Sequence, residues 1–167
     1  MSQPKLLDTL RANRFFEGMH EQELSELASI AQLEQHPKET VIFKEGGPSN
    51  KFFVVIEGSV GLEITIEGRA KRIHSVGACE LLGWSPILGS KSMKATARTL
   101  ATTTLISFDT LQCQALTERA PHLAAALLRR VGRAMDDRLH ATRLQMLQLC
   151  HHHFPDVVPI GQSEGAD

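Results

Sequence analysis

The chain has 167 residues, of which 42% are hydrophobic and 22% charged, and its formal net charge at pH 7 is −1. These values are typical of a soluble globular protein with one core and an appendage. Because the net charge is close to zero, there is no overall field to attract nucleic acid or an anionic membrane. Charge therefore gives no reason to expect either class of partner.

Targeting and redox signals are weak. No apolar run approaches the roughly 20 residues that a membrane-spanning helix needs, and the start Met-Ser-Gln-Pro-Lys is not followed by the apolar region of a signal peptide. Three widely separated cysteines, Cys79, Cys113 and Cys150, favour reduced thiols over a disulfide framework. We therefore expect a cytoplasmic protein that does not bind a membrane.

The first residues, to about position 31, are predicted to be helical. Leu6, Leu7 and Leu10 share one helical face, and apolar residues recur near helical spacing in 21–31. Between these segments, 15–19 is expected to be a connector whose aromatic rings pack onto the main body.

From position 32 to 109 the dominant period of the apolar residues is two, with turn residues between short runs. The clearest run is 58–67, in which alternate residues are predicted to face a core: Val60, Leu62, Ile64 and Ile66. Glu67-Gly68 then makes a tight turn into a returning strand, 70–76. Further strands are expected at 41–43, 52–56 and 105–108. The pattern predicts an antiparallel jelly roll, or double-stranded β-helix, in a mainly β fold with flanking α-helices.

Two helices are expected after the strands. The first is 110–119, capped by Asp109 or Thr110, with Leu111 and Leu116 facing inward. Pro121 opens a longer helix that runs to about position 150. An apolar stripe with a mean spacing of 3.5 residues, the period of a coiled-coil seam, follows this helix. Its members are Leu128, Val131, Met135, Leu139, Thr142, Met146 and Leu149.

The stripe has two interpretations. It can pack back onto the chain's own sheet, or it can pair with the same helix of another protomer. Residues 123–128 are apolar on several sides, so we expect this part to pack on the roll and the distal part to form a homodimer.

The stretch Cys79–Arg98 contains two short patterns, Gly83-Trp84 and Met93-Lys94-Ala95-Thr96. Between them, Ser85-Pro86 is a good start for a short helix, whose free amides could attract an anion. Lysines and an arginine in this stretch could add positive charge or simply be solvated: Lys91, Lys94 and Arg98.

This stretch resembles the phosphate-binding cassette of the cyclic nucleotide-binding domain family. Residues 44–60, with a glycine bend at Gly58, and 75–83 resemble the family as well, so that the similarity extends over most of the chain. In the family, a Glu after the Gly holds the ribose 2′-hydroxyl, and an Arg nine residues later pairs with the cyclic phosphate. Trp84 and Met93 stand at those two positions. The resemblance implies a candidate pocket of Leu82, Gly83, Trp84, Ser85, Met93, Lys94, Ala95 and Thr96.

The resemblance also implies a function. We expect a dimeric, non-enzymatic regulatory module that signals through its C-terminal helix to a protein partner, with ordinary binding of cAMP or cGMP made doubtful by the altered cassette. The alternative is a true cyclic-nucleotide binder in which Lys94, Thr96 and backbone amides hold the phosphate. No fixed cofactor is expected, and the ligand would be a cyclic nucleotide or another small anion. Trp84 could fill the pocket, stack on a planar ligand or anchor the core.

Catalytic and metal-binding patterns are sparse. The sequence contains no Gly-x-Ser-x-Gly, P-loop or zinc-protease motif. A cupin-like metalloenzyme, the remote alternative, would need paired histidines, whereas His36 and His74 are isolated among the predicted strands. A weak metal candidate is the run Cys150, His151, His152 and His153, which could equally be a solvated helix end.

These interpretations divide the chain into a roll with its N-terminal helices (1–119), a dimerisation helix (120–153) and a flexible tail (154–167). In related transcription regulators a helix-turn-helix domain follows the long helix. The tail here is too short for such a domain, so no DNA binding is expected.

Overall fold

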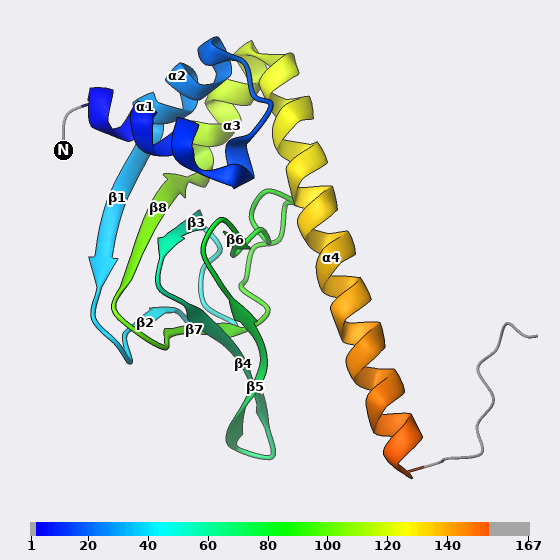
Figure 1. Ribbon diagram of the computed structural model, residues 1–167. Helices are drawn as coiled ribbons and strands as arrows, with labels where there is room; N and C mark the ends of the chain where they lie inside the picture. Colours follow the sequence, from blue (N-terminus) through cyan, green and yellow to red (C-terminus); the bar gives the residue numbers. More distant parts are fainter. Residues whose placement is uncertain (1–2, 154–167) are drawn as a thin grey trace, which may run out of the picture. The chain divides into compact units, whose positions relative to one another are not determined.

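The computed structural model describes residues 3–153, apart from the side chains of 3–4 and 150–153. Two α-helices and a 3₁₀ turn precede the strands of this region, and two α-helices follow them (Figure 1). The helical segments are α1 (Gln3–Ala12), η1 (Arg14–Phe16), α2 (Glu21–Ile30), α3 (Thr110–Arg119) and α4 (Pro121–His153). The strands are β1 (Ala31–His36), β2 (Val41–Phe43), β3 (Lys51–Glu57), β4 (Val60–Ile66), β5 (Arg69–Val76), β6 (Leu81–Leu82), β7 (Thr96–Thr99) and β8 (Thr103–Asp109).

The strands form two four-stranded antiparallel sheets, with the orders β1-β8-β3-β6 and β2-β7-β4-β5. Apart from the β4–β5 hairpin, successive strands cross from one sheet to the other, as in a jelly roll. The predicted mainly β fold with flanking helices is confirmed. Residues 83–95 of the cassette stretch connect β6, at the edge of the first sheet, to β7, inside the second.

Both faces of the first sheet are covered, and β3 is therefore buried continuously from Phe52 to Val55. On the outer face, Phe108 stacks on Phe52, with ring centroids 4.9 Å apart, and meets the ring of Phe16 from η1 at 6.2 Å. Figure 1 shows α1, α2 and α3 gathered together beside β1 and β8, at one end of the first sheet. The predicted packing of the 15–19 connector onto the main body is confirmed at Phe16, which is 2% exposed.

The inner faces of the two sheets enclose the main core. Its members come from both sheets: Phe53, Val55, Val60, Leu62, Val76, Leu82, Ala97 and Leu105, with Ile42, Phe43 and Ala95 packed against them. Burial of this many aliphatic and aromatic side chains contributes most of the free energy that holds the two sheets together.

The β4–β5 hairpin departs from the predicted pattern at its far end. Val60 and Leu62 are buried as predicted, but Ile66 is 48% exposed, so the prediction for this residue is wrong. The reason is that β4 pairs with β7 only from Val60 to Glu63, and beyond this point it has β5 alone as a neighbour. The turn itself is as predicted: Glu67 and Gly68 have positive φ angles of 51° and 74°, as a tight two-residue hairpin turn requires.

Helix α3 has the predicted bounds and the predicted cap, since the Asp109 carboxylate accepts a hydrogen bond from the Gln112 amide at 3.0 Å. Its predicted inward face is wrong, because Leu111 is 74% exposed. Positions 111 and 116 are roughly 140° apart around a helix and cannot share a narrow face. Cys113 is the buried residue instead, and burial raises the pKa of its thiol to about 11, so it stays protonated at neutral pH.

Helix α4 contributes to two compact units, Met1–Val131 and Gly132–Asp167. Leu123, Leu127 and Val131 are buried in the first unit, so the proximal part of this helix is buried as predicted, whereas its packing on the roll itself stays a prediction. The first unit thus extends to position 131, whereas the sequence placed the boundary at 119. The predicted flexible tail, 154–167, lies outside the described residues. In the part of the chain that the structure describes, no helix is long and apolar enough to span a membrane.

Gly58, between β3 and β4, provides a test of the fold. Its φ angle is +90°, and an added Cβ would lie 2.5 Å from the Thr102 carbonyl oxygen and 2.6 Å from Thr103 Oγ1. We predict that Gly58→Ala lowers the free energy of unfolding by about 3 kcal/mol, through backbone strain plus overlap. Gly68→Ala is the matched control, because φ is also positive but the space is open. It should cost about 1 kcal/mol. Urea denaturation measures both, and equal costs would contradict the steric account.

Candidate functional site

The cassette contains one helical turn where the sequence predicts a short helix. Its bonds run from the Ile87 amide to the Trp84 carbonyl at 3.0 Å, from Gly89 to Pro86 at 3.0 Å, and from Ser90 to Ser85 at 2.9 Å. The last two bonds, with Gly89 at a φ of 76°, form a Schellman motif that ends the turn at once. The predicted helix is therefore wrong, and a single turn has too few aligned peptides to attract an anion by its dipole.

Met93 lies in the interior and is 3% exposed. Its backbone is fixed on both sides, since its amide donates to the Gly47 carbonyl at 3.0 Å and its carbonyl accepts from the Gly46 amide at 2.9 Å. Its sulfur lies 3.8 Å from the Ser49 hydroxyl. A Cβ added to Gly83 would lie 3.5 Å from the Met93 ε-methyl and 3.1 Å from the Phe43 ring. The side chain therefore packs beside Gly83 and the Phe43 ring, with the Ser49 hydroxyl at its sulfur.

The surroundings of Met93 continue the core between the sheets. The Phe43 ring stacks on Phe53, with centroids 6.1 Å apart and an angle of 23° between the ring planes. Leu82 is fully buried in the same cluster, and Ala95 packs against it. Three residues of the predicted pocket, Leu82, Met93 and Ala95, are thus parts of the core.

The remaining pocket residues do not converge on a charged centre. Lys94 is exposed, whereas Trp84 and Ser85 are half-buried. The Thr96 hydroxyl accepts a hydrogen bond from the Glu45 amide at 3.0 Å. The Glu45 carboxylate in turn accepts from the Thr65 amide at 3.0 Å. The Thr96 hydroxyl and the Glu45 carboxylate thus attach the loop after β2 to the strands of its own sheet.

The other basic residues of the cassette stretch do not line the interior either. Lys91 is exposed. The guanidinium of Arg98 pairs with the Glu63 carboxylate at 3.3 Å and donates to the Glu39 carbonyl at 3.4 Å. The expectation that Lys91 and Arg98 could be ordinary surface charges agrees with this arrangement.

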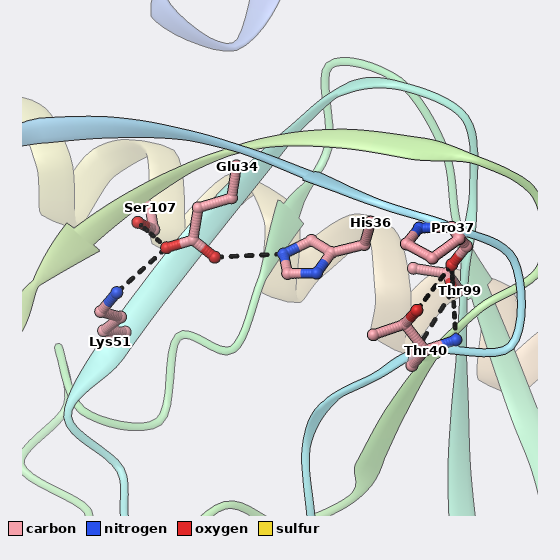
Figure 2. A network of polar contacts seen from close by, with 7 residues as sticks. All are labelled: Glu34, His36, Pro37, Thr40, Lys51, Thr99 and Ser107. Atoms are coloured by element: carbon pink, nitrogen blue, oxygen red, sulfur yellow. Dashed lines mark hydrogen bonds and ion pairs between the residues drawn. The ribbon is translucent and has the colours of Figure 1, made fainter.

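A polar cluster that the sequence analysis missed lies on the first sheet (Figure 2). One Glu34 carboxylate oxygen accepts from the Ser107 hydroxyl at 2.5 Å and from Lys51 Nζ at 3.0 Å, and the other lies 3.1 Å from His36 Nε2. Ser107 lies opposite Phe53 in the β3–β8 register, so the cluster shares the inner face with the core. Its members belong to three adjacent strands, β1, β8 and β3.

Glu34 is the centre of this cluster, and its ionisation reflects its neighbours. Burial by itself raises the pKa of Glu34, but the hydrogen bonds from Ser107, Lys51 and His36, with the charge of Lys51, outweigh burial. The pKa therefore lies below its ordinary value, and the ionised form is favoured in the folded state. The alternation of 32–36 indicates a strand, but only the β1–β8 register shows which residues meet.

A second polar contact fixes the strand that follows the cassette. The fully buried Thr99 hydroxyl accepts from the Thr40 amide at 2.8 Å and donates to the Pro37 carbonyl at 2.7 Å (Figure 2). It thereby attaches the β1–β2 corner to β7. The backbone that leaves the cassette is thus held at its end, as well as at Met93.

Metal-ligating residues do not cluster where their positions are described. Over that part of the chain, no group of three or more His, Cys, Asp or Glu side chains could hold an ion. His36 is on β1 and His74 on β5, in different sheets. The side chains of Cys150, His151, His152 and His153 lie outside the described residues, so a metal site there stays a prediction.

Comparison with known proteins assigns the chain to a family. The family model described as cyclic nucleotide-binding domain matches residues 33–120, which is more than half of the chain. The chain belongs to the cyclic nucleotide-binding domain family. The family resemblance and the fold expected from the sequence are both confirmed.

Solved structures and a curated relative agree with this assignment. The N-terminal domain of a transcriptional regulator from Streptomyces coelicolor is 29% identical, with a TM-score of 0.65, and the match covers 80% of this chain and 94% of that one. A cyclic nucleotide-binding domain from Methylobacillus flagellatus is 18% identical, with a TM-score of 0.74, and the match covers 87% of this chain and 83% of that one. At this identity the likeness shows the fold alone. A Rhodopseudomonas palustris protein named as a potassium channel is 26% identical over 102 residues, covering 61% of this chain and 24% of the relative. The chain thus spans about a quarter of that relative.

The Glu34 cluster of this cyclic nucleotide-binding domain makes a prediction about acid stability. Because its folded pKa is depressed, Glu34 contributes stability above its unfolded pKa of about 4.3, and this is lost as pH falls through the folded value. We predict that Glu34→Gln lowers the free energy of unfolding by about 1 kcal/mol at pH 7, a modest cost because Glu34 is partly exposed to solvent. The variant should also lose less stability than the unmodified chain below about pH 5.

The exposed Glu67 provides the control, since Glu67→Gln should leave the pH profile unchanged. Denaturation with urea between neutral and acidic pH measures the profiles. A Glu34→Gln profile parallel to that of the unmodified chain would contradict the assignment of the shift to this cluster.

Proposed function

We propose that this chain is a non-enzymatic, dimeric regulatory module whose cassette does not hold cAMP or cGMP in the manner usual for its family. The observation that carries the proposal is the burial of Met93 among Phe43, Gly83 and the core between the sheets. This is the position at which the resemblance places the arginine that pairs with the phosphate.

Placing an anion in an apolar site is energetically costly. A cyclic phosphate that leaves water needs a positive or strongly donating partner, and arginine supplies this with a planar pair of N–H groups. A thioether is only a weak hydrogen-bond acceptor and provides no donor. Burial of an unpaired charge beside it costs several kcal/mol. Trp84 likewise has no carboxylate for a ribose hydroxyl.

The alternative, a true binder that uses Lys94 and Thr96, has less support. Lys94 is exposed, and the Thr96 hydroxyl already accepts the hydrogen bond from the Glu45 amide. Binding in this mode would require Lys94 to turn inward and the Glu45 contact to share its acceptor. The predicted anion-binding helix, the third part of this mode, is only a single turn.

The proposed dimer rests on the apolar stripe of α4. Most members of the stripe are substantially exposed within the chain, with exposed fractions between 41% and 62%: Leu128, Met135, Leu139, Met146 and Leu149. Thr142 is exposed as well, whereas Val131 is buried in the first compact unit. A stripe with the coiled-coil period is stabilised when another helix covers it, and a second copy supplies a matching stripe.

The regulatory role is supported by what the relatives are. The S. coelicolor relative is a domain of a transcriptional regulator, and the R. palustris relative is named as a potassium channel. Domains of this kind thus occur beside different outputs, and we propose that α4 passes the signal to a protein partner. Which protein that partner is depends on the pathway in which the domain acts.

The dimer proposal predicts a position-dependent effect of charge on α4. Leu139→Glu would place a carboxylate inside the seam and should convert the dimer to a monomer. Leu147→Glu is the matched control, because Leu147 is 55% exposed but lies on another side of the helix. Sedimentation velocity measures the mass of each. A monomeric unmodified chain, or equal effects of both changes, would argue against the seam.

The ligand proposal predicts no saturable heat in calorimetry of the unmodified chain with cAMP or cGMP below millimolar concentration. The double change Trp84→Glu with Met93→Arg restores both charged groups of the family and should produce measurable nucleotide binding, provided that its thermal unfolding stays cooperative. Micromolar binding by the unmodified chain would refute the proposal. If Lys94→Ala then abolished that binding, the alternative mode would hold.

A further inference from the structure

Arg130, near the end of the part of α4 that belongs to the first compact unit, holds the N-terminal 3₁₀ turn. Its Nε donates to the Phe15 carbonyl at 2.9 Å, and its Nη2 donates to the carbonyls of Phe16 at 3.4 Å and Glu17 at 2.6 Å. Its Nη1 donates to the Ala126 carbonyl in its own helix at 3.0 Å. One guanidinium therefore joins the backbone of η1 to the backbone of α4.

This arrangement depends on the shape of the arginine head. The planar fork presents donors in several fixed directions at once, and three consecutive carbonyls of a tight turn present acceptors in matching directions. A lysine ammonium has the charge but cannot reach the same set of acceptors in one geometry. The contact is therefore specific to arginine, although a surface arginine would be the ordinary expectation from sequence.

On its other side, η1 is held by Asn13, which is 5% exposed. The Asn13 side-chain oxygen accepts from the Phe15 amide at 2.9 Å, and its Nδ2 donates to the Val55 carbonyl at 3.5 Å. Val55 is fully buried in β3. The same carbonyl of Val55 also accepts the Cys79 amide at 2.8 Å, and the Val55 amide donates to the Glu80 carbonyl at 3.0 Å.

Cys79 is the point at which the chain enters the cassette stretch, and its backbone is unusual. Its φ angle is 64°, in the left-handed region that a side-chained residue rarely adopts. Such a conformation is maintained by surrounding contacts, here the bond to Val55. If the hydrogen bond to the Val55 carbonyl is weakened, we therefore expect the backbone of Cys79 to change conformation before its neighbours do.

We infer that Arg130 is a positioning residue that couples the first turns of α4 to the cassette entry at Cys79, through η1, Asn13 and Val55. Each link is a hydrogen bond between residues packed in one compact unit, so a displacement of η1 changes the support of the next member. The coupling stands on these contacts alone. Its use for signalling, from the cassette to α4, rests on the proposed function.

The test is hydrogen exchange of backbone amides, measured by NMR without ligand. In Arg130→Met, the amides of 15–19 and the amide of Cys79 should exchange about tenfold faster, because the support of the Val55 carbonyl network is weakened. Arg129→Met is the matched control, since Arg129 is the exposed neighbour on the same helix. The amides of β4 should not change in either variant. Acceleration at 15–19 alone would overturn the coupling and leave Arg130 as a local clamp.

Asn13 contributes the longest contact of the route and gives the second test. Asn13→Ala should accelerate the Cys79 amide by itself, and combining it with Arg130→Met should add little, because both changes break one route. Fully additive effects would overturn the inference. If Arg130→Met does not fold, Arg130→Lys keeps the charge but loses the fork, and the same exchange pattern is expected of it. Nucleotide titrations and mass measurements do not enter these readouts, so failure here is distinguishable from failure of the proposed function.

Discussion

The contact between Met93, Gly83 and Phe43 is the constraint on which the account of the cassette depends. Gly83 has a φ angle of 70° and little room for a Cβ, because the Phe43 ring and the Met93 methyl lie against it. The connection between β6 and β7 is thus packed onto the core through the Met93 side chain. Backbone bonds to Gly46 and Gly47 hold residue 93 in this position, so that occupation of the interior by its side chain follows from the fold.

Helix α4 is the element through which the proposed signal would leave the domain. The first turns of α4 are part of the same compact unit as the cassette, and the Arg130 contacts join them to η1. Beyond residue 131, α4 carries exposed apolar side chains, on which the proposed dimer rests. The chain therefore combines a buried methionine at position 93 with a C-terminal helix that carries an apolar stripe, and this combination fits the proposed change or loss of ligand better than a lost function.

The sequence predicted most strands, the bounds of α3 and the family, because alternation and turn residues are local signals. What it could not predict depended on the third dimension. Leu111 is exposed because α3 presents Cys113 to the core. Ile66 is exposed because β4 pairs with β7 only as far as Glu63. The residues after Pro86 form a single turn because Gly89 ends it. The Glu34 cluster required the register of β1 on β8, which no single strand contains. The burial of Met93 could not be predicted either. The sequence shows a methionine at this position, but not that Gly83 and the Phe43 ring lie against it.

The Met93 side chain fills the interior beside Gly83. Its ε-methyl group can be observed directly in a spectrum of the chain labelled with ¹³C-methyl methionine, and Met93→Leu assigns the signal. We expect a single signal that does not move when cAMP or cGMP is added to millimolar concentration, while the chain remains folded. A saturable shift of that signal at micromolar nucleotide would show instead that the site opens to the ligand.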